Sequence, residues 1–185
     1  MKHKILKVNK GIVLLLILVV TVISISIVDT LKYAARKEAA GNRASAFVTD
    51  LASLYTWPKN MPDIDAVEFE KNAKKYYTYF DAGYDKVKPY VYDSSVIKEE
   101  LRTMAMNSIR TYLLNEVKPE QVTFSTEIST ISVNKDTALI NGTVTSKTTV
   151  KGGKTFNRSS GFRMSMEYRN EEWIVVWFYP ENEDF

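Results

Sequence analysis

The segment "TFNRSSGFRMSMEYR", residues 155–169, carries the clearest structural pattern in this sequence. Large apolar and polar side chains alternate along it with a period of two, which predicts a strand with one buried and one solvated face. The side chains expected to face the core are Phe156, Phe162, Met164, Met166 and Tyr168, and those expected to face solvent are Asn157, Ser159, Arg163, Ser165, Glu167 and Arg169. The chain is therefore expected to contain a sheet that is covered on one face.

Three further segments around this one have a strand-like pattern. Residues 121–133 and 137–150 precede it, and "EWIVVWFYP", residues 172–180, follows it. The apolar parity of the first of these segments changes after Ile128, which predicts a bulge or bend near Ser129. Because the breaks between the segments are short enough for hairpins, we expect an antiparallel four-stranded meander.

The last of these segments is apolar on both faces. Trp173 and Trp177 share one parity, and Ile174, Val176 and Phe178 share the other. A strand with this pattern is either buried on both sides or faces a partner. One of its faces therefore carries apolar side chains that the core of a single domain does not need.

The segment "AFVTDLASLYTWP", residues 46–58, is predicted to form the first helix of the folded domain. Its side chains Phe47, Leu51 and Leu54 lie on one apolar stripe, and the helix is expected to end at Pro58. We expect this stripe to pack on the concave sheet face made by Phe156, Phe162, Met164 and Met166.

Two more helices are predicted before the strands. Asp65 with Glu68 three residues later has the pattern of a capping box, at the start of a helix running toward Phe80. Apolar residues between Ile97 and Tyr112 recur on one face of another helix. Three helices followed by four antiparallel strands indicate an α+β fold, in which the helices cover the apolar face of a curved sheet.

Residues 11–28, "GIVLLLILVVTVISISIV", contain no charged side chain. A helix of this length spans roughly 27 Å at about 1.5 Å per residue, close to the thickness of the hydrocarbon core of a bilayer. Lys2, Lys4, Lys7 and Lys10 precede this segment without any acid. The positive-inside rule therefore predicts a cytoplasmic tail at residues 1–10, a single transmembrane helix at 11–28, and export of everything beyond it.

Two alternatives compete with a retained membrane anchor. A cleaved signal peptide has the same basic start, but here the apolar run is long, and "DTLKYAARKEAAG" puts charges where a cleavage site belongs. A buried core helix does not fit the charge asymmetry of the flanks. The anchor is favoured, with residues 29–45 as a solvated stalk that breaks most readily at Gly41 and Asn42, and residues 46–185 as the extracytoplasmic domain.

Composition excludes several classes of function. Four of the 25 basic residues and none of the 22 acidic ones precede the span, so residues 29–185 carry a net charge of −1 and no nucleic-acid surface is expected. The chain has no cysteine, and its one histidine, His3, lies in the predicted tail. Disulfides, imidazole bases and histidine-based zinc sites are thereby excluded from the exported domain. We expect no cofactor, no metal and no catalytic residues.

One function open to such an α+β fold is that of an isomerase-like enzyme or a ligand binder, with a carboxylate base and tyrosine donors in a pocket. It predicts that Asp81 or Asp85 faces an open cavity. The aromatic residues singled out as core or interaction residues are Trp57, Tyr76, Tyr79, Tyr84, Tyr90, Tyr92, Trp173 and Trp177.

The order of three helices and four strands, with "LYTWP" ending the first helix, resembles the cone-shaped fold of nuclear transport factor 2-like proteins. With the basic tail, the span and the terminal "EWIVVWFYP", the chain is similar to bitopic VirB-type and TcpC-type assembly subunits of type IV secretion systems, the latter from Gram-positive mobile elements. TcpC-type proteins can carry two such domains, whereas this chain has room for one. The resemblance implies a non-enzymatic membrane scaffold for plasmid transfer by conjugation, which binds copies of itself and other channel proteins. A cell-envelope regulator on the same fold is the other reading left open.

Overall fold

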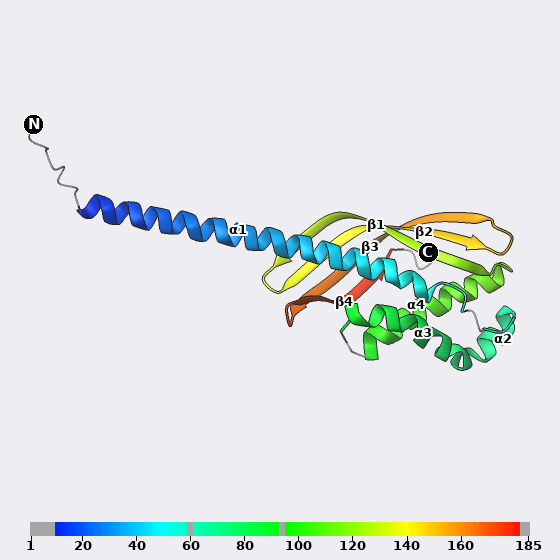
Figure 1. Cartoon of the computed structure of the whole chain (residues 1–185). Coiled ribbons are helices and arrows are strands. Elements are labelled where there is room, and N and C mark those ends of the chain that lie inside the picture. The colour runs from blue at the N-terminus through cyan, green and yellow to red at the C-terminus, as the bar shows by residue number, and fades with distance from the viewer. Residues whose placement is uncertain (1–9, 59–60, 93–94, 182–185) are drawn as a thin grey trace, which may run out of the picture. The chain divides into compact units, whose positions relative to one another are not determined.

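The computed structural model describes residues 10–58, 61–92 and 95–181 (Figure 1). The chain divides into two units, Met1–Arg36 and Lys37–Phe185. Helix α1 (Lys10–Leu51) begins in the first unit and continues into the second. The larger unit begins at Lys37.

In the first unit, α1 is apolar and the side chains of residues 13–28 are exposed. Within the part of the chain that the structure describes, α1 is the one helix long and apolar enough to cross a membrane, by length and composition alone. Hydroxyls in this run donate to the carbonyl four residues earlier, Thr21 Oγ1 to Ile17 O and Ser24 Oγ to Val20 O, both at 2.8 Å. These polar groups are satisfied within the helix, as a hydrocarbon environment requires.

The second unit contains a sheet of four antiparallel strands in the order β1-β2-β3-β4, which confirms the predicted meander. The strands are β1 (Pro119–Asn134), β2 (Thr137–Val150), β3 (Thr155–Arg169) and β4 (Glu172–Pro180). The register of β1 with β2 shifts between Ile128 and Thr130, so Ser129 forms the predicted bulge. The turn between β2 and β3 has Gly152 and Gly153 at positive φ, where glycine is favoured.

Three shorter helices accompany the second half of α1: α2 (Ala66–Lys71), α3 (Tyr77–Val87) and α4 (Ser95–Leu114). Asp65 caps α2 as predicted, because its carboxylate accepts a hydrogen bond from the Glu68 backbone N–H at 2.7 Å. The helix predicted to run toward Phe80 is interrupted at Asn72. The Asn72 backbone leaves the helical range, and its side-chain amide donates to Glu68 Oε1 at 3.0 Å.

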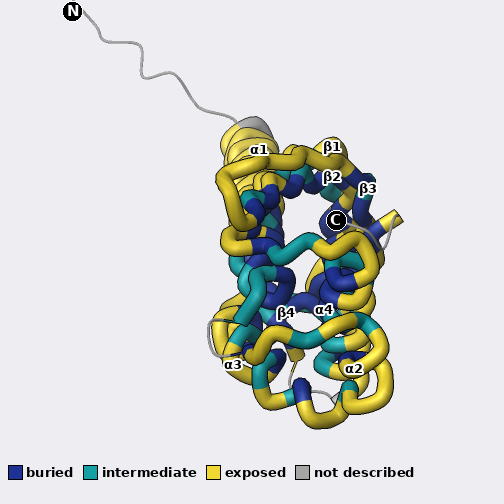
Figure 2. The backbone as a smooth tube through the Cα atoms, turned by 90° about the vertical axis from the view of Figure 1, so that its right-hand side faces the viewer, coloured by how far each residue is buried: buried dark blue, intermediate teal, exposed yellow. Residues whose placement is uncertain are grey.

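The core lies between the sheet and the helices, and the buried positions face this space (Figure 2). The predicted stripe is confirmed, although it continues past α1: Phe47 and Leu51 lie on α1 and Leu54 on the 3-10 turn Ala52–Leu54 that follows it. All three side chains share one buried cluster with the apolar residues of β3. The cluster includes Phe47, Leu51, Leu54, Phe162, Met164 and Met166. Phe47 also meets Phe178 of β4 edge to face, with ring centroids 5.4 Å apart.

Phe156 does not belong to this core, so the prediction that it faces inward with the buried residues is wrong. Its side chain is 46% exposed. Phe156 pairs with Thr148 beside the β2–β3 turn, and along β3 the main apolar cluster begins only at Phe162. There Phe156 lines an open cavity. Tyr168, also predicted to face inward, is partly buried and packs against the core.

Helix α1 continues through Gly41 and Asn42, where a break was expected. Ala40, Gly41 and Ala44 are buried, so the prediction of a solvated stalk at residues 29–45 is wrong for its C-terminal part. A Cβ atom on Gly41 would lie 2.8 Å from Ile131 Cδ1, well inside the normal separation of two carbon atoms. Small side chains therefore let α1 approach the sheet closely.

β4 contains a bulge that its sequence pattern did not predict. Trp177 pairs with Ser165 of β3, but Val175 pairs with the next residue of β3, Met166, so Val176 has no partner in the register. The inward parity changes at this point. Trp173 is 2% exposed and Trp177 is 42% exposed, so the two tryptophans expected on one face lie on opposite faces.

Candidate functional site

The C-terminal end of β4 carries two exposed aromatic side chains. Trp177 is 42% and Tyr179 is 52% exposed, and their rings stack with centroids 5.8 Å apart and an interplanar angle of 4°. They pair in register with Ser165 and Arg163, residues of the outer sheet face. Exposed aromatic surface of this kind is characteristic of an interaction site.

A groove of about 590 Å³ lies between this end of β4 and α4. Its apolar lining residues are Val96 and Met104 of α4 and Trp177, Phe178, Tyr179 and Pro180 of β4. Its polar lining residues are Glu99, Glu100 and Thr103 of α4, and Glu99 is paired with Arg102 of the same helix. The groove is thus mainly apolar, with two carboxylates on its α4 side.

β4 is an edge strand, and only the first part of its outer edge is covered. The Tyr92 N–H donates to Val175 O at 3.2 Å, and Arg43 Nε donates to Trp173 O at 3.3 Å. Among residues 10–58, 61–92 and 95–181, no hydrogen bond from outside the sheet reaches residues 176–180 of β4. The aromatic pair and the groove therefore adjoin a strand edge that is able to pair with another chain.

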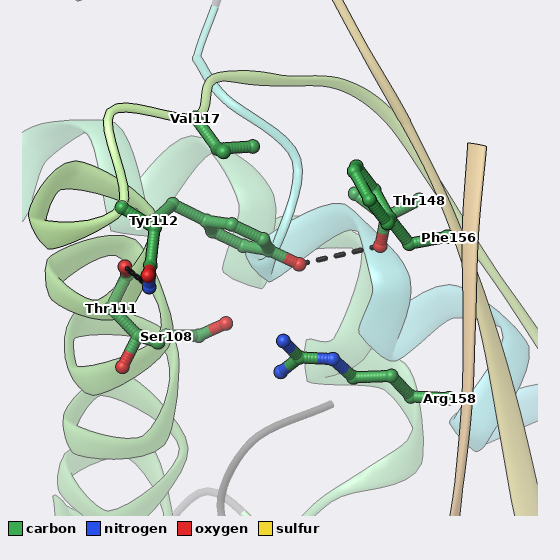
Figure 3. Close-up of a pocket in the computed structure, with 8 residues that line it drawn as sticks. Ser108, Thr111, Tyr112, Val117, Thr148, Phe156 and Arg158 are labelled. Carbon is green, nitrogen blue, oxygen red and sulfur yellow. Dashed lines mark hydrogen bonds between the residues drawn. The ribbon is translucent and has the colours of Figure 1, made fainter. Parts of the chain in front are cut away.

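A separate cavity of about 330 Å³ opens between the C-terminal part of α4 and the turn end of β2 and β3 (Figure 3). Its lining residues are Ser108, Thr111, Tyr112, Asn115, Val117, Thr148, Phe156 and Arg158. The isomerase-like alternative required Asp81 or Asp85 on such a cavity, and neither lines this one. Asp81 instead pairs with Lys98 at 2.8 Å, and Asp85 is exposed. The carboxylate base of that alternative is thus absent from the cavity's lining.

The aromatic residues singled out from the sequence fall into three groups and do not form one site. Tyr76, Tyr84 and Trp173 are buried, Trp57, Tyr79 and Tyr90 are half-buried, and Tyr92 and Trp177 are exposed. Of these, Trp177 alone lines the β4 groove. Of the membrane-flanking lysines, Lys10 is the first residue of α1, and Lys2, Lys4 and Lys7 lie outside the described residues.

Tyr90 is part of a polar network that ties α1 to β4. Its hydroxyl donates to Asp50 Oδ2 at 2.6 Å, and the Arg43 guanidinium lies 4.6 Å from the centre of its ring. Arg43 also pairs with Glu172 at 3.0 Å. The hydrogen bond to Asp50, together with burial, raises the pKa of Tyr90 above its ordinary value. The Tyr90 phenol is therefore a structural donor.

Sequence reasoning missed Tyr179 on the groove, and Ser108 and Arg158 on the cavity. Tyr179 was missed because the bulge at Val176, which turns Tyr179 and Trp177 to the outer face, was not predicted. A signal for Arg158 was present, because it shares the parity of the residues predicted to face inward along β3. A charged side chain at a core parity indicates either the end of the core or a polar site.

No protein-family model matches this sequence, and no curated protein matches it. Solved structures with some similarity include a nuclear transport factor 2 (NTF2-like) superfamily protein from Salmonella enterica serovar Typhimurium, 14% identical, with a TM-score of 0.33. That match covers 44% of this chain and 58% of the other. The association domain of CaMKII from C. elegans is 9% identical, with a TM-score of 0.36, and the match covers 64% of this chain and 98% of that one. Similarity of this degree says nothing about what this chain binds or does.

Proposed function

We propose that this protein is a single-pass membrane protein whose second unit is a nuclear transport factor 2-like domain that acts as an assembly scaffold. The observation that carries this proposal is the stacked pair Trp177 and Tyr179 beside the uncovered edge of β4. The scaffold works by binding, and its first partner is a second copy of the same chain.

The first unit supports the membrane part of the proposal. Residues 13–28 form an exposed apolar helix, and the hydroxyls of Thr21 and Ser24 are satisfied within it. A helix of this kind anchors the second unit to a bilayer, with the basic residues on the cytoplasmic side. Confinement to a membrane raises the local concentration of the domain, so a weak contact between copies is sufficient for assembly.

A second copy is the occupant that best fits the β4 edge. Two identical edge strands that meet antiparallel about a two-fold axis present the same unpaired backbone groups and the same aromatic pair to each other. Arg43 and Tyr92 cover the edge at Trp173 and Val175, which limits the pairing to residues 176–180. The contact is therefore short, and the stacked rings supply most of its apolar surface.

The setting we propose is a conjugative type IV secretion system, in which the assembled domains also contact other channel proteins. This part rests on the resemblance in element order, basic tail and membrane span to bitopic assembly subunits. We assign the domain no catalytic role, and the cavity near Arg158 lacks a carboxylate among its lining residues.

Self-association is tested by Förster transfer between donor-labelled and acceptor-labelled full chains in proteoliposomes. The double variant Trp177→Ser, Tyr179→Ser should reduce the transfer at least several-fold. The matched control is Leu139→Ser, which removes a side chain of β2 that is 58% exposed. Equal Förster transfer in the double variant and the wild type would exclude the β4 edge as the contact between copies.

The cellular setting requires a separate experiment. Deletion of the coding region should abolish transfer of a mobile element to recipient cells, and the wild-type chain supplied in trans should restore it. Complementation by the Trp177→Ser, Tyr179→Ser variant should be poor. Undiminished DNA transfer in the deletion strain would exclude a role in conjugation. It would not affect the proposed self-association, which the Förster experiment tests.

A further inference from the structure

The inner face of the sheet changes from apolar to polar along β2 and β3. The buried polar side chains of the described residues are Ser108, Ser146, Thr148 and Ser160. Ser146, Thr148 and Ser160 lie near the β2–β3 turn, and Ser108 lies on α4 across the cavity. Buried hydroxyls are costly in a core unless they are hydrogen-bonded. Their concentration at one end of the sheet therefore marks this end as distinct from the hydrophobic core.

Ser108 brings a buried hydroxyl to the cavity from α4. Its side chain is 3% exposed, and it lines the cavity. Across the cavity, the hydroxyls of Tyr112 and Thr148 lie 3.3 Å apart, at the long end of hydrogen-bond distances. The Ser108 hydroxyl, a buried donor, and the Tyr112–Thr148 pair thus face the same space (Figure 3).

Arg158 supplies the charge of this site. Its guanidinium points into the space faced by Ser108 and Tyr112 (Figure 3). Among the residues that the structure describes, no acidic side chain lines the cavity and none forms an ion pair with Arg158. A guanidinium beside neutral hydroxyl donors is a binding site for an oxyanion, which it can contact with two parallel hydrogen bonds.

The rest of the lining is apolar. Val117, the Tyr112 ring and the Phe156 side chain border the cavity. Phe156 is 46% exposed, which is unusual for a phenylalanine side chain. A ligand bound in the cavity would cover it. The volume of about 330 Å³ is at the small end of the range for organic ligands.

We propose that this cavity binds a small monocarboxylic acid with an apolar body. The carboxylate lies on Arg158 and accepts a hydrogen bond from Ser108, and the apolar body lies against Phe156 and Val117. A single cation matches a single negative charge, whereas a phosphate dianion would leave one charge unpaired. This site is independent of the β4 edge that the proposed function uses.

The proposal is tested by ligand-observed saturation-transfer NMR on the full chain in nanodiscs, with empty nanodiscs as the blank. The probes are butyrate, benzoate and phenylacetate, with phenylacetamide as the neutral counterpart and inorganic phosphate as the competing oxyanion. We expect at least one of the carboxylates to bind saturably, and to bind at least ten-fold more tightly than phenylacetamide and phosphate.

Two variants assign the binding to this cavity. Arg158→Gln should weaken carboxylate binding about ten-fold or more, and Ser108→Ala should weaken it by a smaller factor. The matched control Arg163→Gln removes a guanidinium from the outer face of the same strand and should leave binding unchanged. An unchanged guanidinium unfolding midpoint for Arg158→Gln verifies that the variant is folded.

Three results would overturn the proposal. They are saturable binding of none of the three carboxylates, binding of phenylacetamide or phosphate as tight as that of the best carboxylate, and equal carboxylate binding by Arg158→Gln and the wild type. None of these results bears on self-association through β4, which the double variant at Trp177 and Tyr179 tests separately.

Discussion

Gly41 of α1 lies directly against Ile131 of β1, so closely that a Cβ atom on Gly41 would stand 2.8 Å from Ile131 Cδ1. Gly41→Leu should therefore lower the free energy of unfolding by about 1–3 kcal/mol, because a larger side chain forces α1 away from the sheet. Guanidinium denaturation followed by tryptophan fluorescence measures this, since all three tryptophans lie in the second unit.

Two controls sharpen the Gly41 prediction. Gly41→Ala should be close to neutral, because the gain of about 1 kcal/mol in helix propensity offsets a clash with the end of one flexible side chain. Asn42→Leu, on an exposed position of the same turn, should also change stability little. Equal unfolding midpoints for Gly41→Leu and Asn42→Leu would contradict the close approach.

Phe47→Ala should lower the free energy of unfolding by about 3–5 kcal/mol, the usual cost of removing a fully buried aromatic ring. The Phe47 side chain is 0% exposed and packs on Phe178 and Tyr90. Phe156→Ala is the matched comparison and should cost less than about 1 kcal/mol, because Phe156 is 46% exposed. The same denaturation assay measures both variants. A similar loss of unfolding free energy in the two would contradict the assignment of Phe156 to the cavity lining instead of the core.

Tyr90→Phe should lower the free energy of unfolding by about 1–3 kcal/mol, because it removes a hydrogen bond to the Asp50 carboxylate. The effect should depend on pH. The pKa of Tyr90 is raised in the folded state, so the phenol stabilises the fold at pH values below about 10, the tyrosine pKa of an unfolded chain. That contribution is lost as the pH rises through the higher, folded-state value.

Unfolding free energies of the wild type and Tyr90→Phe, measured at intervals between pH 8 and pH 11, check this dependence. The other tyrosines are common to both proteins, so their titration largely cancels in the difference. The difference should be constant up to about pH 10 and shrink above it. A difference that does not change up to pH 11 would indicate that the hydrogen bond does not hold the Tyr90 proton.

In intact protoplasts, added protease should digest the second unit and leave an N-terminal tag intact. The reason is the charge asymmetry around the apolar segment: Lys2, Lys4, Lys7 and Lys10 precede it without any acid. Replacing all four lysines with glutamate should expose the tag in a fraction of the molecules. Protection of the second unit in the wild type would place it in the cytoplasm and exclude the proposed export.

Features that depend on neighbours along the chain were predictable from the sequence. The period of two in residues 155–169, the bulge at Ser129 and the Asp65 cap all follow from side chains a few positions apart, and the structure contains each of them. The stripe of Phe47, Leu51 and Leu54 was predictable for the same reason, because a helix brings residues three and four apart onto one face. The sheet order followed from the short breaks between strands.

The sites depended on contacts between segments far apart in the chain, and only the tertiary structure decided them. The burial of Gly41 requires Ile131 to lie above it, and the exposure of Phe156 depends on how far the core extends along β3. The bulge at Val176 follows no turn or glycine signal in β4, yet it places Trp177 and Tyr179 on the outer face. Local pattern assigns a side chain to one face of its own element, but burial depends on what the rest of the chain packs against that face.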